Sequence, residues 1–160
     1  MRFKAISRPA VEEANYERDR HIIISIRCPF GPESSKPRPV TNVATQAVLY
    51  LQADDLDHAP MAGSATWGML GGKFQLFSRF DAEAILSVIR ATNPEVVVVH
   101  CQAGQSRSAG VAAALSKFYN DNDTRFFHMP YTPNMHVYRT MLNYLMEESH
   151  ETVQSREESN

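Results

Sequence analysis

Apolar residues gather in short runs separated by polar segments, and this pattern predicts strands that alternate with helices. The runs 21–26 and 96–99 are almost wholly apolar, so we expect them to be buried strands of a sheet covered on both faces. The run 47–53 predicts another core strand, and 3–6 predicts a short edge strand. One further short strand is expected at 124–129.

Four segments are predicted to be helices from their apolar stripes or their alanine content. They are 9–16, 80–91, 109–119 and 135–148. Pro9 suits the first turn of its helix, and Ser78 with Asp81 forms a capping pair ahead of the second helix. Asn93 and Pro94 end that second helix.

Strands alternating with helices are typical of an α/β fold, in which helices flank a mostly parallel central sheet. The 160 residues suffice for one domain, which we expect to span residues 1–150. The polar segment 151–160 is expected to be a disordered tail. The glycine-rich segment 59–76 predicts a mobile loop, in which Trp67 and Phe74 either line the rim of a substrate site or pack the loop down, with packing favoured.

The composition narrows the range of partners and compartments. A net charge of -2 gives no basic field, so no nucleic-acid partner is expected. Cys28 and Cys101 are too few for a disulfide framework, which indicates a reducing compartment. No apolar run reaches membrane-spanning length and no signal segment follows the first residues, so we expect a cytoplasmic protein without a membrane partner. Cys28 is expected to be structural, with a redox pairing to Cys101 as the alternative.

Residues 100–108, with the sequence HCQAGQSRS, carry the strongest chemical signal. A buried strand ends at Cys101, five residues intervene, and Arg107 opens the next helix. Backbone N–H groups of such a strand-to-helix loop, together with the helix N-terminus, attract an anion and favour the thiolate form of a cysteine. The guanidinium fork of Arg107 can hold two phosphate oxygens at once. The segment therefore predicts a phosphate-binding loop with a nucleophilic thiol at its base.

This segment resembles the signature of the cysteine-dependent protein phosphatases, which is His-Cys, five residues, Arg, then Ser or Thr. The match is complete at His100, Cys101, Gly104, Arg107 and Ser108. Residues 20–148 resemble the compact dual-specificity phosphatases, strictly at this loop and loosely elsewhere. The resemblance implies a dual-specificity phosphatase-like fold and a phosphomonoester hydrolase, most simply a protein tyrosine or dual-specificity phosphatase. It also implies a cysteinyl-phosphate intermediate and no metal or organic cofactor.

The resemblance also assigns roles within the loop. Cys101 is the nucleophile, and the hydroxyl of Ser108 bonds the thiolate and eases its departure from the phosphoenzyme. The phosphate-binding positions are Gln102, Ala103, Gly104, Gln105, Ser106 and Arg107. His100 could form a Cys–His dyad, but successive strand side chains face opposite ways. We therefore expect His100 to shape the loop from behind.

Transfer of phosphate from an ester to the thiolate also needs an acid, because an alkoxide is a poor leaving group. In this family the acid is an aspartate on a loop after an earlier strand. Aligning strand 47–53 with the family puts Asp55 at that position, with Asp57 as runner-up and Asp54 third. The spacing to Cys101 is longer than usual in the family, so the glycine-rich segment reads as an insertion. Asn134 either supports the phosphate-binding loop or caps the last helix.

Three other functions fit parts of this pattern. One is a phosphatase of a non-protein substrate, such as an RNA 5′ end, a phosphoinositide or a small metabolite. The variable loop positions are neutral, which disfavours the multiply charged phosphoinositides. A catalytically silent phosphate-binding module and an arsenate reductase or sulfurtransferase are the others. The retained cysteine and arginine disfavour the silent module, and the place of the motif past mid-chain disfavours the small reductases. The expected partner is a phosphorylated protein or another phosphomonoester.

Overall fold

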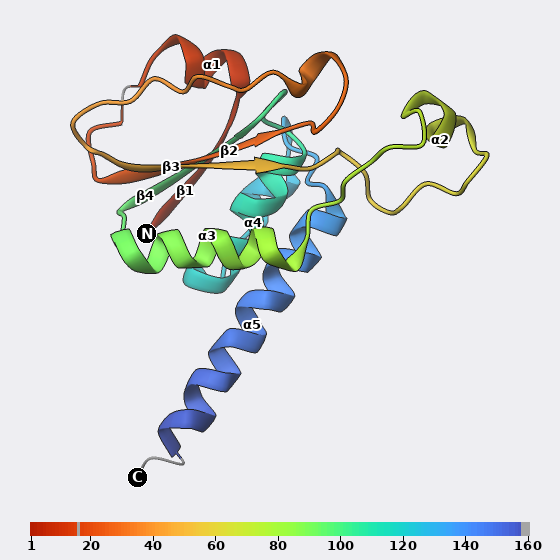
Figure 1. The fold of residues 1–160 in the computed structure, drawn as a ribbon. Coiled ribbons are helices and arrows are strands. Elements are labelled where there is room, and N and C mark those ends of the chain that lie inside the picture. Colours follow the sequence, from red (N-terminus) through yellow and green to blue (C-terminus); the bar gives the residue numbers. More distant parts are fainter. Residues whose placement is uncertain (16, 158–160) are drawn as a thin grey trace.

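Four parallel strands form the central sheet of the computed structural model, which describes residues 1–15 and 17–157 (Figure 1). Across the sheet the strands follow the order β1 (Arg2–Ser7), β4 (Val96–Cys101), β2 (His21–Arg27) and β3 (Thr45–Gln52). The two central strands, β4 and β2, are the two apolar runs predicted to be buried on both faces. β1 is an edge strand as expected, whereas β3, expected in the core, lies at the other edge and is only partly buried.

Helices cover both faces of the sheet unequally. They are α1 (Arg8–Glu13), α2 (Ala65–Met69), α3 (Arg79–Thr92), α4 (Arg107–Asn120) and α5 (Met135–Glu157), with short 3-10 helices η1 (Pro32–Ser34) and η2 (Thr124–Phe127). α3, α4 and α5 pack together on one face, and α1 lies on the other (Figure 1). The predicted α/β class, with a parallel sheet flanked by helices, is therefore confirmed.

Side chains of β4 alternate between these two faces and so divide the interior. Val97, Val99 and Cys101 join the large core under α3, α4 and α5. Val96 and Val98 join a smaller cluster beneath α1. By the same alternation His100 lies on the α1 side, on the opposite face from Cys101.

Capping explains where α3 begins and ends. The side chain of Ser78 accepts from the backbone N–H of Asp81, and the Asp81 carboxylate accepts from the backbone N–H of Ser78 at 2.8 Å. This reciprocal pair is the predicted capping box. Asn93 ends the helix in a left-handed conformation, with φ 44°.

The expected strand at 124–129 is wrong, because residues 124–127 form η2 and the two residues after it are a bend and a turn. Phe126 is buried in the large core, and the next residue, Phe127, packs its ring edge-on against Tyr138, with 5.5 Å between centroids. A strand would point two successive aromatic side chains to opposite faces, whereas a tight turn lets both pack on the same group of helices. The adjacent aromatic residues therefore favour the turn.

Two helix ends also differ from the expectation. α1 ends at Glu13, before the predicted end at residue 16, which lies outside the described residues. α5 continues to Glu157 through a segment expected to be a disordered tail, and residues 158–160 lie outside the described residues. The residues from 147 onward include several strong helix formers, which lets the helix extend beyond its packed half.

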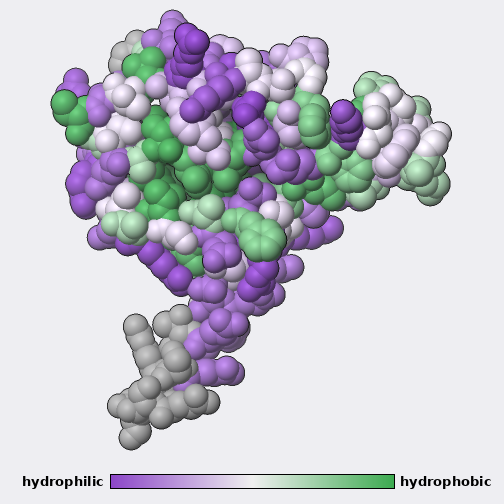
Figure 2. Space-filling model, in the orientation of Figure 1, coloured by the Kyte–Doolittle hydropathy of each residue, from purple (hydrophilic) through white to green (hydrophobic). Residues whose placement is uncertain are grey.

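The glycine-rich insertion forms an arm, defined here as residues 55–74, that projects from the body and carries α2 (Figure 1). Within it the rings of Trp67 and Phe74 meet edge to face, with centroids 6.0 Å apart. Figure 2 shows pale and green side chains over the arm, and Met61 and Met69 are among its most exposed residues. The arm is therefore packed mainly on itself, as the aromatic pair suggested.

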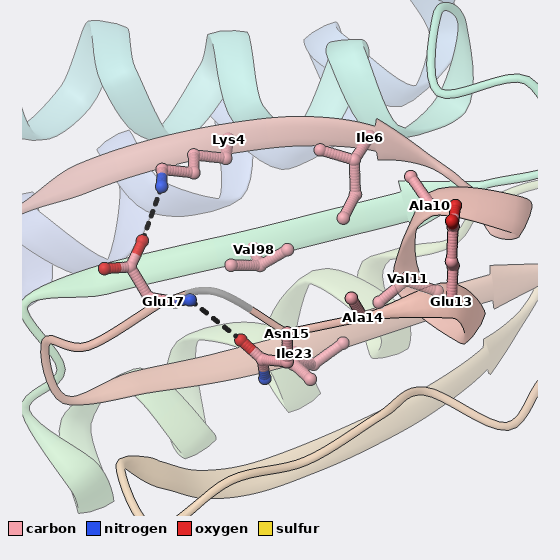
Figure 3. A pocket seen from close by; sticks show the side chains of 10 residues that line it. All are labelled: Lys4, Ile6, Ala10, Val11, Glu13, Ala14, Asn15, Glu17, Ile23 and Val98. Carbon is pink, nitrogen blue, oxygen red and sulfur yellow. Dashed lines mark hydrogen bonds and ion pairs between the residues drawn. The ribbon is translucent and has the colours of Figure 1, made fainter.

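A cavity of about 350 Å³ lies between α1 and the sheet (Figure 3). Its floor is apolar and includes Ile6, Ile23 and Val98, and the ion pair of Lys4 with Glu17, 2.5 Å between nitrogen and oxygen, lies at its rim. No residue of the loop between β4 and α4 lines it. The candidate chemistry therefore lies elsewhere, at the carboxyl end of the sheet.

Candidate active site

The loop from Cys101 to Arg107, called here the phosphate loop, connects the end of β4 to the start of α4. Three of its carbonyl oxygens are bonded outward. The Gln102 carbonyl accepts from the N–H of Arg8 at 3.1 Å, that of Gln105 from the N–H of Thr132 at 2.9 Å, and that of Ser106 from the N–H of Asn134 at 3.1 Å. In a trans peptide the next N–H points the opposite way, so the N–H groups that follow these carbonyls turn toward the inside of the loop.

Gly104 shows why the phosphate loop tolerates no side chain at its centre. Its φ is +75°, in the left-handed region that favours glycine. A Cβ atom placed there would lie 2.3 Å from the carbonyl carbon of Ile6 and 2.4 Å from the nitrogen of Ser7. The loop therefore packs directly against the backbone at the end of β1.

Cys101 and Ser108 lie at the base of the phosphate loop, and both are buried. The sulfur of Cys101 is 3.2 Å from the hydroxyl oxygen of Ser108. Ser108 is the second residue of α4, so the first turn of the helix brings a hydroxyl group to the thiol. This is the pairing that the sequence motif led us to expect.

Arg107 is 3% exposed, which is unusual for an arginine. Its Nη1 donates to the carbonyl oxygen of Ala53 at 2.8 Å and to the sulfur of Cys28 at 3.2 Å. Its buried Nε has no hydrogen-bond partner among the described residues. Burial alone would lower the pKa of Arg107, but Cys28, Cys101 and Asp55 outweigh it and raise that pKa above its usual range. The guanidinium therefore stays charged, with a donor free on its Nε side.

His100 lies behind the phosphate loop. Its Nε2 is 2.8 Å from the hydroxyl oxygen of Ser25, which belongs to the neighbouring strand β2. Burial is the largest influence on this imidazole and lowers its pKa to about 4. His100 is therefore neutral at neutral pH, and its bond to Ser25 ties β4 to β2 one residue before the thiol.

The three aspartates after β3 have separate surroundings. Asp55 Oδ1 accepts from the hydroxyl of Ser106 at 2.7 Å and from the side-chain amide of Asn134 at 2.9 Å. Asp57 instead accepts from the N–H of Met135 at 3.1 Å, at the start of α5. In the part of the chain that the structure describes, Asp55 is thus the one of the three whose hydrogen bonds reach the phosphate loop.

Asp54 closes the stem of the arm. Its N–H donates to the carbonyl of Gln75 at 2.7 Å, and its buried carboxylate accepts from the N–H of Gln75 at 2.8 Å. The side-chain amide of Gln75 also donates to the carbonyl of Gln52 at 3.0 Å. The chain therefore leaves and rejoins the body at one clamped point, directly before Asp55.

Asn134 combines the two roles that the sequence left open. Its side-chain oxygen accepts from the N–H of Val137 at 3.0 Å, which caps α5. Its side-chain nitrogen donates to Asp55, and its backbone N–H donates to the Ser106 carbonyl. The start of α5 is thereby joined to the phosphate loop and to the candidate acid.

Sequence reasoning missed the place of Cys28, which was expected to be structural. It follows β2 directly, and the carboxyl ends of parallel strands meet at one edge of the sheet, so its position at the same edge as the loop after β4 was available as a signal. The Ala53 carbonyl could not have been found, because a backbone group carries no sequence signature.

Among the described residues, no group of three or more His, Cys, Asp or Glu side chains is arranged to hold a metal ion. None of the described helices has the length and apolar character needed to cross a bilayer.

Comparison with known proteins identified similar structures only. No protein-family model matches the chain, and no curated protein matches its sequence. The structure is similar to a mouse protein described as a candidate dual specificity phosphatase, solved with zinc tungstate, with a TM-score of 0.48, 15% identity, and coverage of 92% of this chain and 84% of that one. It is also similar to human DUSP28, with a TM-score of 0.49, 16% identity and coverage of 93% and 94%.

Proposed function

We propose that this protein hydrolyses phosphomonoesters through a cysteinyl-phosphate intermediate, as a protein tyrosine or dual-specificity phosphatase. The observation that carries the proposal is the buried, charged Arg107, whose Nε has no hydrogen-bond partner among the described residues, in a loop with a thiol at its base. A buried donor of this kind calls for an acceptor. A phosphate oxygen is the acceptor that suits an arginine fork and inward-facing backbone N–H groups.

In the first step the Cys101 thiolate attacks phosphorus and a sulfur–phosphorus bond forms. The bond from phosphorus to the leaving oxygen breaks, and Asp55 gives its proton to that oxygen. Arg107 and the N–H groups of the phosphate loop hold the equatorial oxygens and stabilise the charge that develops on them. Asp55 suits this role because its Oδ1 is held by Ser106 and Asn134, which fixes the carboxyl group at the loop.

In the second step a water molecule attacks phosphorus and gives a proton to Asp55. The sulfur–phosphorus bond breaks, inorganic phosphate leaves, and the sulfur departs as a thiolate. The Ser108 hydroxyl, 3.2 Å from that sulfur, can donate a hydrogen bond to the thiolate as it forms. The two steps return the enzyme to its starting protonation state.

Turnover of para-nitrophenyl phosphate by the full chain tests the nucleophile. Cys101→Ser should abolish turnover while the protein still melts cooperatively, and exhaustive chelation should leave wild-type activity unchanged. Vanadate should inhibit the wild type. Wild-type-like turnover of Cys101→Ser, or activity lost on chelation and restored by a divalent metal, would assign the protein to another class.

Substrates with different leaving groups test whether Asp55 is the acid. Asp55→Ala should slow hydrolysis of alkyl phosphates most, because their alkoxides need a proton, and should matter less for an activated aryl phosphate. It should also flatten the basic limb of the pH–rate profile, which reports loss of the acid's proton. Asp57→Ala is the matched control and should keep that limb. If Asp57→Ala alone shows the leaving-group effect, Asp57 is the acid.

A further inference from the structure

A second cysteine lies against the phosphate-binding arginine. Cys28 follows the end of β2, and its sulfur accepts from Nη1 of Arg107 at 3.2 Å. On its other side the thiol donates to Oε2 of Glu33, with 3.7 Å between sulfur and oxygen. Glu33 belongs to η1, in the loop that follows β2. A line of hydrogen bonds therefore runs from the Glu33 carboxylate through the thiol to the guanidinium.

From this arrangement we propose that Cys28 is a positioning residue, which orients the guanidinium of Arg107 for the phosphate through its contacts with Arg107 and Glu33. The proposal rests on the proposed function and extends it to a residue outside the phosphate loop. It assigns to Cys28 a polar role in place of the structural one expected from the sequence.

The protonation of Cys28 fits this role. Burial raises the pKa of its thiol most, Glu33 and Asp54 raise it further, and Arg107 only partly offsets them. The group is therefore a neutral thiol at neutral pH. A neutral thiol has one S–H to donate and lone pairs that accept weakly, so it can serve Glu33 and Arg107 together.

The two contacts on Nη1 fix more than the position of Arg107. Both N–H bonds of Nη1 lie in the guanidinium plane, so acceptors at Ala53 and Cys28 define the orientation of that plane. The opposite edge, which carries Nε, is then held for a substrate. Without Cys28, the Ala53 carbonyl alone would hold Nη1, and the plane could turn about that single bond.

Replacing Cys28 in a graded series tests the proposal. Cys28→Ser keeps a group that donates and accepts, Cys28→Val keeps apolar volume without either capacity, and Cys28→Ala removes both. The measurements are kcat on para-nitrophenyl phosphate and the affinity for inorganic phosphate, each beside a thermal melt. We expect the Val and Ala variants to lose about fivefold to tenfold in both quantities and Ser to stay within about twofold of wild type.

Two outcomes of the Cys28 series overturn the proposal. Val at wild-type level would show that Cys28 acts by packing alone, and Ser as impaired as Ala would show that a hydrogen-bonding group there does not orient Arg107. Glu33 supplies an independent arm should a Cys28 variant melt abnormally. Glu33→Ala should lower phosphate affinity by a smaller factor than Cys28→Ala does. Glu33→Gln retains an acceptor and should leave phosphate affinity unchanged. The exposed Glu83→Ala is the matched control, and an unchanged affinity in Glu33→Ala also overturns the proposal.

The phosphate measurements separate this proposal from the proposed function. In a Cys101→Ser background no turnover occurs, and phosphate affinity still reports the orientation of Arg107. If wild type shows no Cys101-dependent turnover but the Cys28 series changes phosphate affinity as expected, the reaction is wrong and the positioning role stands. If turnover depends on Cys101 but phosphate affinity is the same across the Cys28 series, the positioning role is wrong and the proposed reaction stands.

Discussion

His100 should make the stability of the folded protein depend on pH over a range that its chemistry defines. The imidazole is fully buried, and burial is the main reason that its pKa falls from 6.5 to about 4. In the unfolded chain the same group titrates at its ordinary value. Between these two values the unfolded state therefore binds more protons than the folded state, and the free energy of unfolding rises with pH.

The magnitude follows from the gap between the two pKa values. Each pH unit within that range is worth about 1.4 kcal/mol, so lowering the pH from 6.5 to 5 should cost about 2 kcal/mol through this one group. The stabilisation is complete above the unfolded pKa and is lost as the pH falls toward the folded one. Carboxylates titrate mostly below this window, which keeps the signal of His100 separate.

Urea unfolding of wild type and His100→Gln, at steps from pH 7.5 to 5, measures this effect. Glutamine carries an amide nitrogen near the place of Nε2, so the bond to Ser25 can be kept while the titrating group is removed. The wild type should lose about 2 kcal/mol more than the variant over this range. The exposed His58→Gln is the control and should follow the wild type. Parallel curves for wild type and His100→Gln would mean that burial does not hold this imidazole neutral.

Three further predictions concern single contacts. Arg107→Lys should lower kcat on an aryl phosphate by on the order of 10²-fold, because a lysine keeps the charge and loses the fork, and a loss of only a few fold would refute its role. Gly104→Ala should destabilise the fold by at least about 2 kcal/mol, since its φ and the backbone of Ile6 both oppose a side chain, and an unchanged urea midpoint contradicts this. Ser78→Ala should cost about 1 kcal/mol by breaking the cap with Asp81, measured by the same unfolding assay, and should leave kcat unchanged.

The features that the sequence predicted are those that short segments determine. The capping box from Ser78 to Asp81 spans only four neighbouring positions, and the two buried strands are evident from continuous apolar runs. The phosphate loop also lies within one segment, because nine consecutive residues contain the thiol, the fork and the hydroxyl. Each of these can be deduced without knowing what packs against it.

The features that the sequence did not predict depend on distant parts of the chain. β3 has the composition of a core strand, but its place at the edge follows from the order in which the strands pair. The segment 124–129 has strand-like composition. The 3-10 helix that it contains depends on two distant partners, the core that buries Phe126 and the ring of Tyr138 that packs against Phe127. The contact of Cys28 with Arg107 joins residues 79 positions apart. No local pattern distinguishes such a cysteine from one that only fills space.

The choice of Asp55 shows how an insertion can be tolerated next to a site. The number of residues between Asp55 and Cys101 put the choice of Asp55 in question, because the arm lengthens the chain between these two residues. The arm begins and ends at the clamp between Asp54 and Gln75, and Asp55 is the first residue after that clamp, so the clamp fixes where its backbone starts whatever the length of the rest of the arm. Asp55 is held from the other side by Ser106 and Asn134, which belong to the phosphate loop and to the start of α5. Anchors on both sides thus fix the carboxylate, and the length of the arm becomes free to vary without moving it.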